Sequence, residues 1–365
     1  MIKWFIEHFP EYVTKMRECS YHYENRVFNL HHLEGDVWSH TVMAYNLGIK
    51  HKVKKTILWA ILLHDLGRVF TRKVDSENSK VIFGDFEGVS SFVALEILKK
   101  ANVPENEIIE IIKIISFQYT IIDHIKYNDP SFDELSKMFI YEENLLKDLF
   151  EYVRCDLFGR IIDESKIEYY DIDRVDQSIK KINQISKNKK IKSTKKNILY
   201  ILVGPPCSRK SSWVNRKSKE FITINRDSCD EEIGKKYGKH SYDEAYDFVK
   251  ENPDVEKEAD ELYEAKREFA KNSKNKNIII DNPNLMLSNR KKWITPFLDT
   301  HTIKVIVFLD SLENIVKCSK KRSIEINKYI DEKLIINKLK TFYFPLYSEG
   351  IDEIKYIFNK EEYLL

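Results

Sequence analysis

Apolar side chains recur at helical spacing through most of the first half of the chain. Residues 36–49 place them three and four positions apart, and Asp36 is a candidate N-cap for this helix. Residues 53–67 form a longer apolar run that stops at Gly67, as a mostly buried helix does. The same periodicity is found in residues 86–100, 105–118, 131–139, 142–158 and 172–185. We therefore expect the first domain to be all-α.

The pattern changes after residue 196. Short, apolar and largely β-branched runs now alternate with segments of helical periodicity. The runs cover residues 197–204, 221–225, 277–281 and 303–310. Buried strands that alternate with helices are typical of a parallel sheet. The second domain is therefore predicted to be α/β.

A lysine-rich stretch, SKNKKIKSTKK at residues 186–196, separates the two patterns. We expect a solvated linker, and a basic contact for a phosphate backbone is the alternative. The predicted domains are residues 1–185 and residues 197–365, on either side of this linker.

Composition narrows the function classes. The net charge of +2 gives no sign of a polyanionic partner, so any nucleic-acid contact must be local. The five cysteines are scattered and form no CxxC pair, which argues against a zinc ribbon or a disulfide scaffold. We expect a cytoplasmic protein without a signal peptide or membrane span. The oligomeric state stays open.

The stretch ILYILVGPPCSRKSSW, residues 198–213, runs from a predicted strand into a near match to a phosphate-binding loop. Gly204, Lys210 and Ser211 fall in register with the pattern, but Arg209 occupies the position of its second glycine. Backbone N–H groups of such a loop cradle phosphates, while the lysine reaches the terminal phosphates and the serine holds Mg²⁺. The predicted ATP-binding residues are Gly204, Ser208, Arg209, Lys210, Ser211 and Ser212.

Two further residues of the second half are candidates for phosphoryl-transfer chemistry. Asp227 follows the predicted strand 221–225, where a carboxylate can accept the proton of an acceptor hydroxyl. A helix N-cap is its alternative role, and the two roles are compatible. Arg322 lies in a charged helical stretch that would neutralise charge in the transition state or be simply solvated.

In this order, GPPCSRKSSW, INRDS, DNPNL and VKCSKKR resemble the polynucleotide 5′-hydroxyl kinase family, over about residues 198–355. The resemblance implies that Lys210 and Ser211 bind ATP and Mg²⁺. It also implies that Asp227 is the general base and that Arg322 is an arginine of the lid.

The chain departs from that family at three positions. Arg209 replaces a glycine of the loop, and Cys318 stands where the lid has an arginine. Asp230 stands where the family has an arginine that grips the acceptor's phosphate. A carboxylate would repel that phosphate, so these departures bear directly on whether the kinase is active.

The first half contains a set of residues suited to a metal ion: His40, His64, Asp65 and Asp156. Imidazole and carboxylate bind divalent transition metals and leave positions open for water. The metal lowers the pKa of that water and polarises a phosphoryl oxygen. A satisfied core residue is the usual role of a single helical histidine, but His64 and Asp65 end an apolar run where charge needs a partner. We expect Mn²⁺, Ni²⁺, Co²⁺ or Fe²⁺ there, with Asp65 also taking part in catalysis.

These residues, in EGDVWSHTV, LWAILLHDLGR and RCDLFGR, resemble the HD domains of RNA end-processing and tRNA-repair enzymes, over roughly residues 34–160. Asp85 and Gln118 stand where those families commonly have histidine. Asp85 is a further candidate metal ligand, although a one-metal site is favoured. Arg68 and Arg160 are candidate phosphate-binding residues.

An HD domain joined to a polynucleotide kinase resembles the two-domain RNA end-healing enzymes. The resemblance implies ATP-dependent phosphorylation of 5′-hydroxyl ends and metal-dependent hydrolysis of 2′,3′-cyclic phosphate or 2′/3′-phosphate ends. RNA ends, including tRNA fragments, would be the substrates, with DNA as an open alternative, and a separate RNA ligase would act afterwards. The alternative function is an HD phosphohydrolase of nucleotides or RNA ends whose C-terminal domain binds nucleotides without catalysis. A non-enzymatic scaffold is a further alternative.

Overall fold

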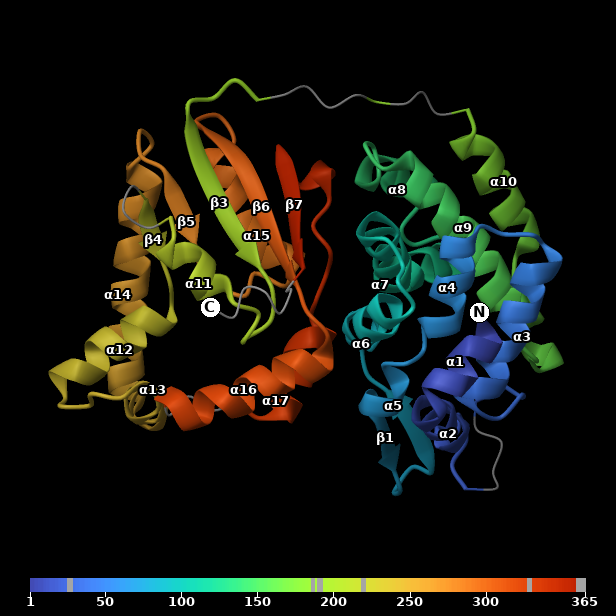
Figure 1. Ribbon diagram of the computed structural model, residues 1–365. Helices are drawn as coiled ribbons and strands as arrows, with labels where there is room; N and C mark the ends of the chain where they lie inside the picture. Colours follow the sequence, from blue (N-terminus) through green and yellow to red (C-terminus); the bar gives the residue numbers. More distant parts are fainter. Residues whose placement is uncertain (25–28, 185–187, 189–192, 218–220, 327–329, 359–365) are drawn as a thin grey trace. The chain divides into compact units, whose positions relative to one another are not determined.

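The computed structural model describes residues 1–24, 29–184, 188, 193–217, 221–326 and 330–358 (Figure 1). The chain forms two compact units. Unit 1 comprises residues 1–189 and 339–344, and unit 2 comprises residues 190–338 and 345–365. Most of the predicted linker, 186–196, lies outside the described residues. Its solvation therefore stays a prediction.

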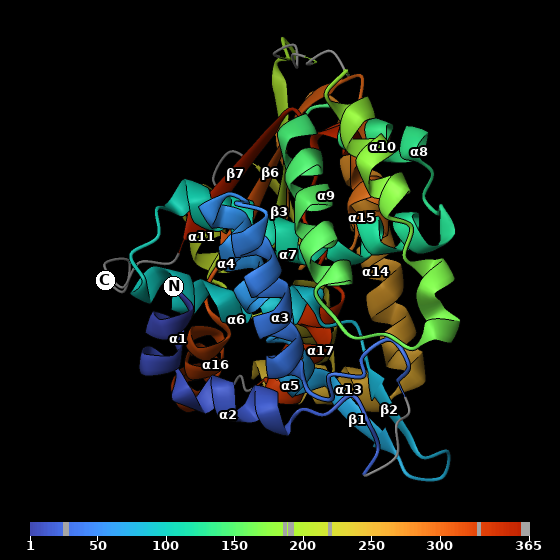
Figure 2. The same cartoon turned by 90° about the vertical axis from the view of Figure 1, so that its right-hand side faces the viewer.

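Four helices form the centre of unit 1 and pack against one another: α3 (Val37–Lys50), α4 (Lys55–Leu63), α7 (Glu105–Tyr127) and α9 (Glu143–Phe158) (Figure 2). Around them lie α1 (Ile2–His8), α2 (Pro10–Glu18), α5 (Arg68–Thr71), α6 (Glu87–Lys100), α8 (Phe132–Met138), η1 (Glu164–Tyr169) and α10 (Ile172–Ile182). The predicted helical first domain is confirmed. Helix α7 continues beyond its predicted end because Ile121, Ile122 and Ile125 extend its buried face.

Unit 1 also contains a small antiparallel hairpin that the helical pattern did not predict. Strand β1 (Arg72–Asp75) pairs with β2 (Lys80–Phe83). Each strand is short and only partly buried, so neither carries the apolar run by which strands were recognised elsewhere.

A segment from near the C-terminus completes the core of unit 1. Phe342 packs edge-on against Phe92, with ring centroids 5.0 Å apart, and Tyr343 packs in the same way against Phe117. A Cβ atom added to Gly88 would come within 2.1 Å of the Leu339 carbonyl oxygen, so this close approach requires glycine. The sequence placed residues 339–344 in the second domain, whereas the structure packs them into the first unit.

Unit 2 contains a five-stranded parallel sheet in the order β4-β5-β3-β6-β7. The four predicted strands are β3 (Asn197–Val203), β4 (Ile222–Ile224), β5 (Ile278–Ile280) and β6 (His301–Leu309). Strand β7 (Glu353–Phe358) was not predicted. It lies at the edge of the sheet, where alternating exposed residues replace a continuous apolar run. The predicted α/β fold with a parallel sheet is confirmed.

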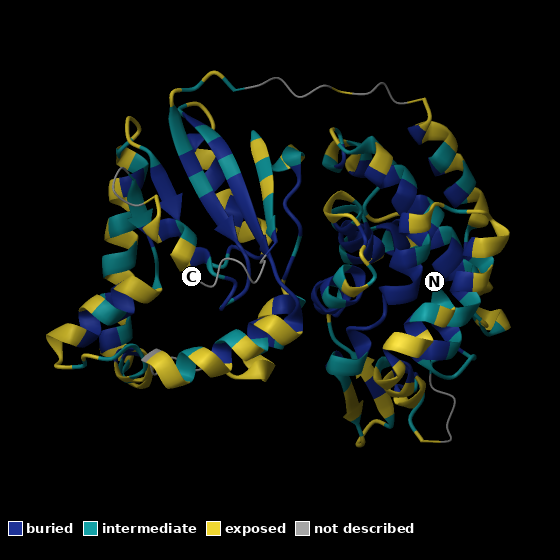
Figure 3. Ribbon diagram, viewed as in Figure 1, coloured by how far each residue is buried: buried dark blue, intermediate teal, exposed yellow. Residues whose placement is uncertain are grey.

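The helices of unit 2 are α11 (Lys210–Asn215), α12 (Asp227–Lys236), α13 (Tyr242–Glu251), α14 (Pro253–Asn272), α15 (Leu287–Ile294), α16 (Leu312–Ile326) and α17 (Glu332–Lys340), with short turns η3 (Thr295–Phe297) and η4 (Tyr347–Glu349). Exposed side chains gather on these helices, while β3 and β5 are largely buried (Figure 3). The carboxyl ends of parallel strands meet at one edge, which brings the segments after β3, β4 and β5 together. Within the described part of the chain, no helix combines the length and apolarity that crossing a bilayer requires.

Candidate active sites

Three helices position the candidate metal ligands of unit 1. Helix α3 starts at Asp36, whose carboxylate accepts the Ser39 N–H at 2.9 Å, and His40 follows within its first turn. Helix α9 carries Asp156. Helix α4 ends at Leu63, so His64 is its C-cap and Asp65 lies in the turn beyond it. The sequence had predicted that both residues lie on the helix. This turn directs both side chains into one cluster.

The donor atoms of this cluster lie at the separations that one metal ion needs. His40 Nε2 is 2.8 Å from Asp156 Oδ1, and His64 Nε2 is 3.3 Å from the same oxygen and 3.4 Å from Asp65 Oδ2. Two ligands about 2.1 Å from a common ion are roughly 3.0 to 3.4 Å apart. The two His64 distances fall within this range, and the His40–Asp156 contact is slightly shorter, as a direct hydrogen bond is. All four side chains are buried. The structure thus brings together the ligands predicted from the sequence.

His64 provides a direct test of whether the cluster fits a metal. Its Nδ1 lies 2.7 Å from the Ile61 carbonyl oxygen, which places the ring proton there and leaves Nε2 facing the cluster. Nε2 is buried and makes no well-aligned hydrogen bond among the described residues. It faces carboxylate oxygens of Asp65 and Asp156 at 3.4 and 3.3 Å without a good hydrogen bond to either, and a divalent ion held between these groups would satisfy all three. The residues therefore fit a metal ion.

Two arginines keep the ligand carboxylates ionised. Arg68 Nε is 2.7 Å from Asp65 Oδ1, and Arg160 Nη2 is 2.6 Å from Asp156 Oδ2. Burial alone would raise both carboxyl pKa values, but the arginines and neighbouring histidines hold the pKa of Asp65 and of Asp156 well below the usual range. The arginines predicted to bind phosphate are thus engaged with the ligands themselves.

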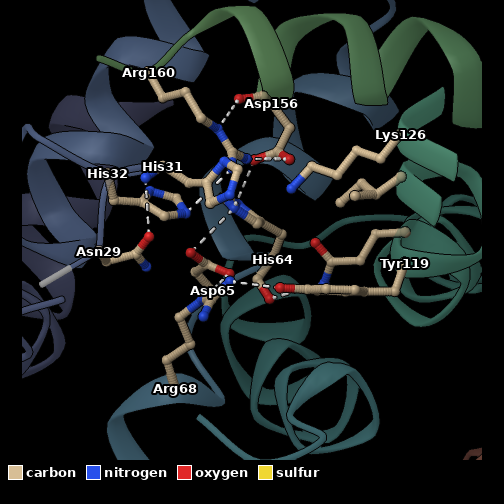
Figure 4. Close-up of a pocket in the computed structure, with 12 residues that line it drawn as sticks. Asn29, His31, His32, His64, Asp65, Arg68, Tyr119, Lys126, Asp156 and Arg160 are labelled. Atoms are coloured by element: carbon tan, nitrogen blue, oxygen red, sulfur yellow. Dashed lines mark hydrogen bonds and ion pairs between the residues drawn. The ribbon is translucent and has the colours of Figure 1, made fainter. Parts of the chain in front are cut away.

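A pocket of about 180 Å³ opens beside the cluster. Its wall carries the basic side chains Arg68, Lys126 and Arg160 against the carboxylates Asp65 and Asp156. Figure 4 shows Lys126 reaching into the pocket from the side opposite His31. Burial and the charge of Arg160 lower the pKa of Lys126 to about 8. A net positive lining next to metal ligands suits a phosphoryl group.

Glu34 is the main residue of this site that no sequence pattern indicated. Its Oε1 lies 2.7 Å from His32 Nδ1 and 3.2 Å from His40 Nδ1, and its Oε2 accepts the Ile161 N–H at 3.0 Å. A carboxylate behind a ligand histidine fixes the ring and raises its basicity. The nearest hint in the sequence is that Glu34 stands between His32 and the helix of His40, in HHLEGD, but this order does not show which histidine it contacts.

Asp85 and Gln118, the two positions that depart from the HD pattern, lie in different places relative to the pocket. Asp85 is exposed in the loop between β2 and α6, and it neither lines the pocket nor joins the buried ligand cluster. The structure therefore does not bring this candidate ligand to the site. Gln118 does line the pocket, and its Oε1 accepts the Tyr152 hydroxyl at 2.7 Å.

In unit 2 the phosphate loop connects β3 to α11. A Cβ atom on Gly204 would come within 2.8 Å of Ser208 Oγ, so any side chain there would have to displace this hydroxyl. Arg209 adopts the left-handed conformation, with φ of 66° and ψ of 21°. A glycine would take this conformation without strain, and a side chain there costs about 1–2 kcal/mol. The loop thus keeps its shape without the glycine. Arg209 Nη1 is buried and has no hydrogen-bond partner among the described residues.

Lys210 is buried and closes the loop on itself. Its Nζ donates to the carbonyl oxygens of Gly204 at 2.8 Å and Pro205 at 2.7 Å. Burial lowers the pKa of Lys210 to about 8, against the opposing effect of the Asp281 and Asp227 carboxylates. The predicted ATP-binding residues Ser211 and Ser212 are exposed on the first turn of α11, and Ser208 Oγ donates to the Pro205 carbonyl.

Asp227 is the first residue of α12, and Arg226 occupies the N-cap position, so the N-cap alternative for Asp227 is not observed. The Asp227 carboxylate is exposed and accepts the Tyr242 hydroxyl at 3.2 Å. Asp281, at the end of β5, accepts the Asn225 side-chain amide at 3.0 Å. Both aspartates act electrostatically on Lys210, so the structure gathers them at the phosphate loop.

The unexpected Asp230 has a partner. Arg226 contacts Asp230 through Nη1, and its Nη2 lies 2.7 Å from Asp260 Oδ1. Asp230 therefore does not present an unneutralised carboxylate to an incoming phosphate. It fixes Arg226, a cation next to Asp227 that no sequence pattern indicated.

Arg322 on α16 reaches the phosphate loop, where its Nη1 lies 3.5 Å from Cys207 Sγ. A hydrogen bond from the Cys318 thiol and the charge of Arg322 lower the pKa of Cys207 to about 6. The structure thus brings the predicted lid arginine to the loop, and Cys318 contacts the loop in place of a second arginine.

Two family models match the chain. The HD domain matches residues 37–176, a range that includes all four candidate metal ligands, and the AAA domain matches residues 199–342, a range that runs from the phosphate loop past Arg322. The first unit thus carries an HD domain and the second a kinase-like phosphate-loop domain. No curated protein matches the chain.

Proposed function

We propose that this protein is a bifunctional RNA end-healing enzyme. It phosphorylates 5′-hydroxyl ends with ATP and hydrolyses 2′,3′-cyclic phosphate or 2′/3′-phosphate ends, after which a separate RNA ligase seals the strand. The observation that carries the proposal is the presence of two sites in one chain. One is a pocket beside a buried cluster of candidate metal ligands, and the other is a phosphate loop beside a candidate general base. RNA cleavage that leaves a 5′-hydroxyl and a cyclic phosphate needs both reactions.

In the hydrolase site, His40, His64, Asp65 and Asp156 would hold a divalent transition metal, which supplies an activated water and polarises the phosphoryl oxygen. Arg68 and Arg160 keep the two carboxylates ionised for this task. Lys126, which lines the same pocket, offsets the charge of the phosphoryl group. The pocket of about 180 Å³ admits the terminal phosphoester and shields it from bulk water.

In the kinase site, Lys210 exchanges its carbonyl partners for the phosphates of ATP, and the buried Nη1 of Arg209 is a further donor toward them. Ser211 and Asp281 would hold the Mg²⁺ ion, which would neutralise charge on the phosphates. Asp227 accepts the proton of the 5′-hydroxyl, and Arg322 stabilises the charge of the transferred phosphoryl group from the side of α16.

The test uses one RNA oligonucleotide with a 5′-hydroxyl and a 2′,3′-cyclic phosphate, γ-labelled ATP, Mg²⁺ and Mn²⁺. Wild type should label the 5′ end and open the cyclic phosphate. Lys210→Ala should lose only the labelling, and His64→Ala should lose only the opening. If labelling is absent from wild type while opening persists, the hydrolase with a non-catalytic nucleotide-binding domain replaces this proposal. Labelling that survives Lys210→Ala would rule out the phosphate loop as its source.

A further inference from the structure

Two tyrosines, one exposed and one half-buried, form an aromatic pair at the end of helix α7. Tyr127 is the last residue of that helix and is 60% exposed, and Tyr169 is the last residue of η1. Their ring centroids lie 6.1 Å apart with an interplanar angle of 69°. Packing in the core does not account for a tyrosine this exposed, and a ligand that covers the ring would remove apolar surface from water.

Aromatic contacts connect this pair to the pocket of the HD domain. The Tyr169 ring lies 5.9 Å from the ring of His31, and His31 Nδ1 is 2.9 Å from the Tyr170 hydroxyl. His31 lines the pocket, and so does Lys126, the residue before Tyr127 (Figure 4). A track of ring contacts therefore leads from His31, in the wall of the pocket, through Tyr169 to the exposed Tyr127.

Lysines accompany the track. Lys126 Nζ lies 5.5 Å from the Tyr170 ring and Lys166 Nζ lies 5.8 Å from the Tyr169 ring. Neither lysine has a carboxylate within ion-pair distance among the described residues. Glu164 and Glu168 are nevertheless exposed on the same short helix, so the track is not a broadly basic surface. Its chemistry combines flat rings with isolated cations, which is how proteins bind unpaired nucleotides.

The volume of the pocket limits how much of a substrate it can enclose. Sites that enclose a drug-sized ligand have volumes of about 300–1,000 Å³, whereas this pocket measures about 180 Å³. It has room for a terminal phosphoester and part of its sugar, so the bases of the substrate must lie outside it. His31 lines the pocket and contacts Tyr169, which itself does not line it.

We infer that Tyr127 and Tyr169 form a stacking subsite for the bases next to the reacting end of a single-stranded polynucleotide. The inference rests on the proposed hydrolysis of phosphate ends. It assigns to the HD domain a preference for polynucleotide ends over mononucleotides, with recognition by stacking and not by base-specific hydrogen bonds. Because isolated lysines contribute little long-range attraction, added salt should weaken this preference only slightly.

The test measures kcat/KM of the full chain on 3′-phosphorylated RNA from a mononucleotide to a hexamer, in Mn²⁺. Wild type should prefer the hexamer. Tyr127→Ala and Tyr169→Ala should each lower kcat/KM on the hexamer by about 5- to 100-fold, the range for loss of one base–aromatic stack, and so reduce the length preference. Tyr127→Trp should retain it. Tyr237→Ala, which removes a tyrosine that is 45% exposed in unit 2, is the matched control and should change nothing.

The inference is overturned if wild type hydrolyses mononucleotide and hexamer equally well, or if both alanine variants keep the full preference. The rings would then belong to a surface for a protein partner. If no substrate is hydrolysed with any divalent metal, the proposed hydrolysis itself fails. Fluorescence anisotropy of a labelled 3′-phosphorylated hexamer then decides the inference, because weaker binding by Tyr127→Ala supports the subsite and unchanged binding refutes it.

Discussion

The two candidate sites of this chain handle phosphoryl groups by opposite structural means. In unit 1, side chains from α3, the end of α4 and α9 meet in a buried cluster, with donor atoms already at ligand spacing. In unit 2, the loop backbone forms the site, its lysine is bonded to the loop's own carbonyls, and Asp227 is exposed. The first site is set by core packing, whereas the second is completed by its substrates. Substitutions should therefore affect metal retention in unit 1 and catalytic rate in unit 2.

The largest effect should come from breaking the buried cluster. Asp156→Ala removes a carboxylate that contacts both His40 and His64. The affinity for the metal and the rate of phosphate release should each fall by at least about 1,000-fold. The rate of 5′-phosphorylation should not change. Metal analysis of the purified protein and a phosphate-release assay measure this. Asp85→Ala is the control and should retain metal, because Asp85 is exposed outside the cluster. Loss of metal from that variant would return Asp85 to the ligand set.

In unit 2, Asp227→Asn should lower kcat for 5′-phosphorylation by roughly 100- to 10,000-fold, since the amide cannot accept the hydroxyl proton. The KM for ATP should change much less than kcat, because the proposed role of Asp227 is to accept the proton of the acceptor hydroxyl and not to bind phosphate. Steady-state kinetics at varied ATP measures both constants. Tyr242→Phe, which removes only the hydroxyl that donates to Asp227, should cost a few-fold. A large rise in KM with unchanged kcat would instead assign Asp227 to nucleotide binding.

Glu34→Gln should have an intermediate effect. The amide weakens the support of His40, so metal affinity should fall by about 10- to 100-fold, and excess metal should restore hydrolysis. Titration of activity with Mn²⁺ measures the shift. The prediction fails if saturating metal does not recover the rate, because Glu34 would then act on the reaction itself.

A further prediction for unit 2 follows from the lowered pKa of Lys210. With the pKa at about 8 before ATP binds, the lysine loses its proton above pH 8, whereas bound phosphates favour the charged form. ATP binding should therefore take up a proton above pH 8, and affinity should weaken by up to about tenfold per pH unit there. Calorimetry at pH 7 and pH 9 in two buffers of different ionisation enthalpy measures the uptake. Equal proton uptake at both pH values would contradict the pKa.

The smallest effect concerns loop strain. Arg209→Gly should stabilise unit 2 by up to about 1 kcal/mol, because glycine adopts the left-handed conformation freely but is more flexible when unfolded. Arg216→Gly is the matched control. It changes a residue at the end of the same helix with ordinary helical φ, so it should destabilise. Denaturant unfolding measures both. A destabilised Arg209→Gly would mean that the buried guanidinium contributes more than the strain costs.

The two units also differ in how far sequence reasoning reached. Hydrophobic periodicity predicted most helices of unit 1 and the inner strands of unit 2, because core-facing residues impose a local repeat. It gave no range for the N-terminal helices α1 and α2 or for the short helix α5. It did not reveal the hairpin β1–β2 or the edge strand β7, because these strands are partly exposed and lack a continuous apolar run. The ligand residues and the phosphate loop were identified because each lies within, or directly after, a recognisable helix or strand.

The sequence by itself determined the two fold classes, the four candidate metal ligands and the loop with its altered glycine position, since these depend on residue type and short spacing. Only the tertiary structure decided that Glu34 supports His40, that Asp230 is paired with Arg226, and that Asp85 lies outside the cluster. It alone placed residues 339–344 in unit 1. Each of these depends on where side chains come to lie once helices and loops have packed, and no local pattern of apolar and polar residues encodes that.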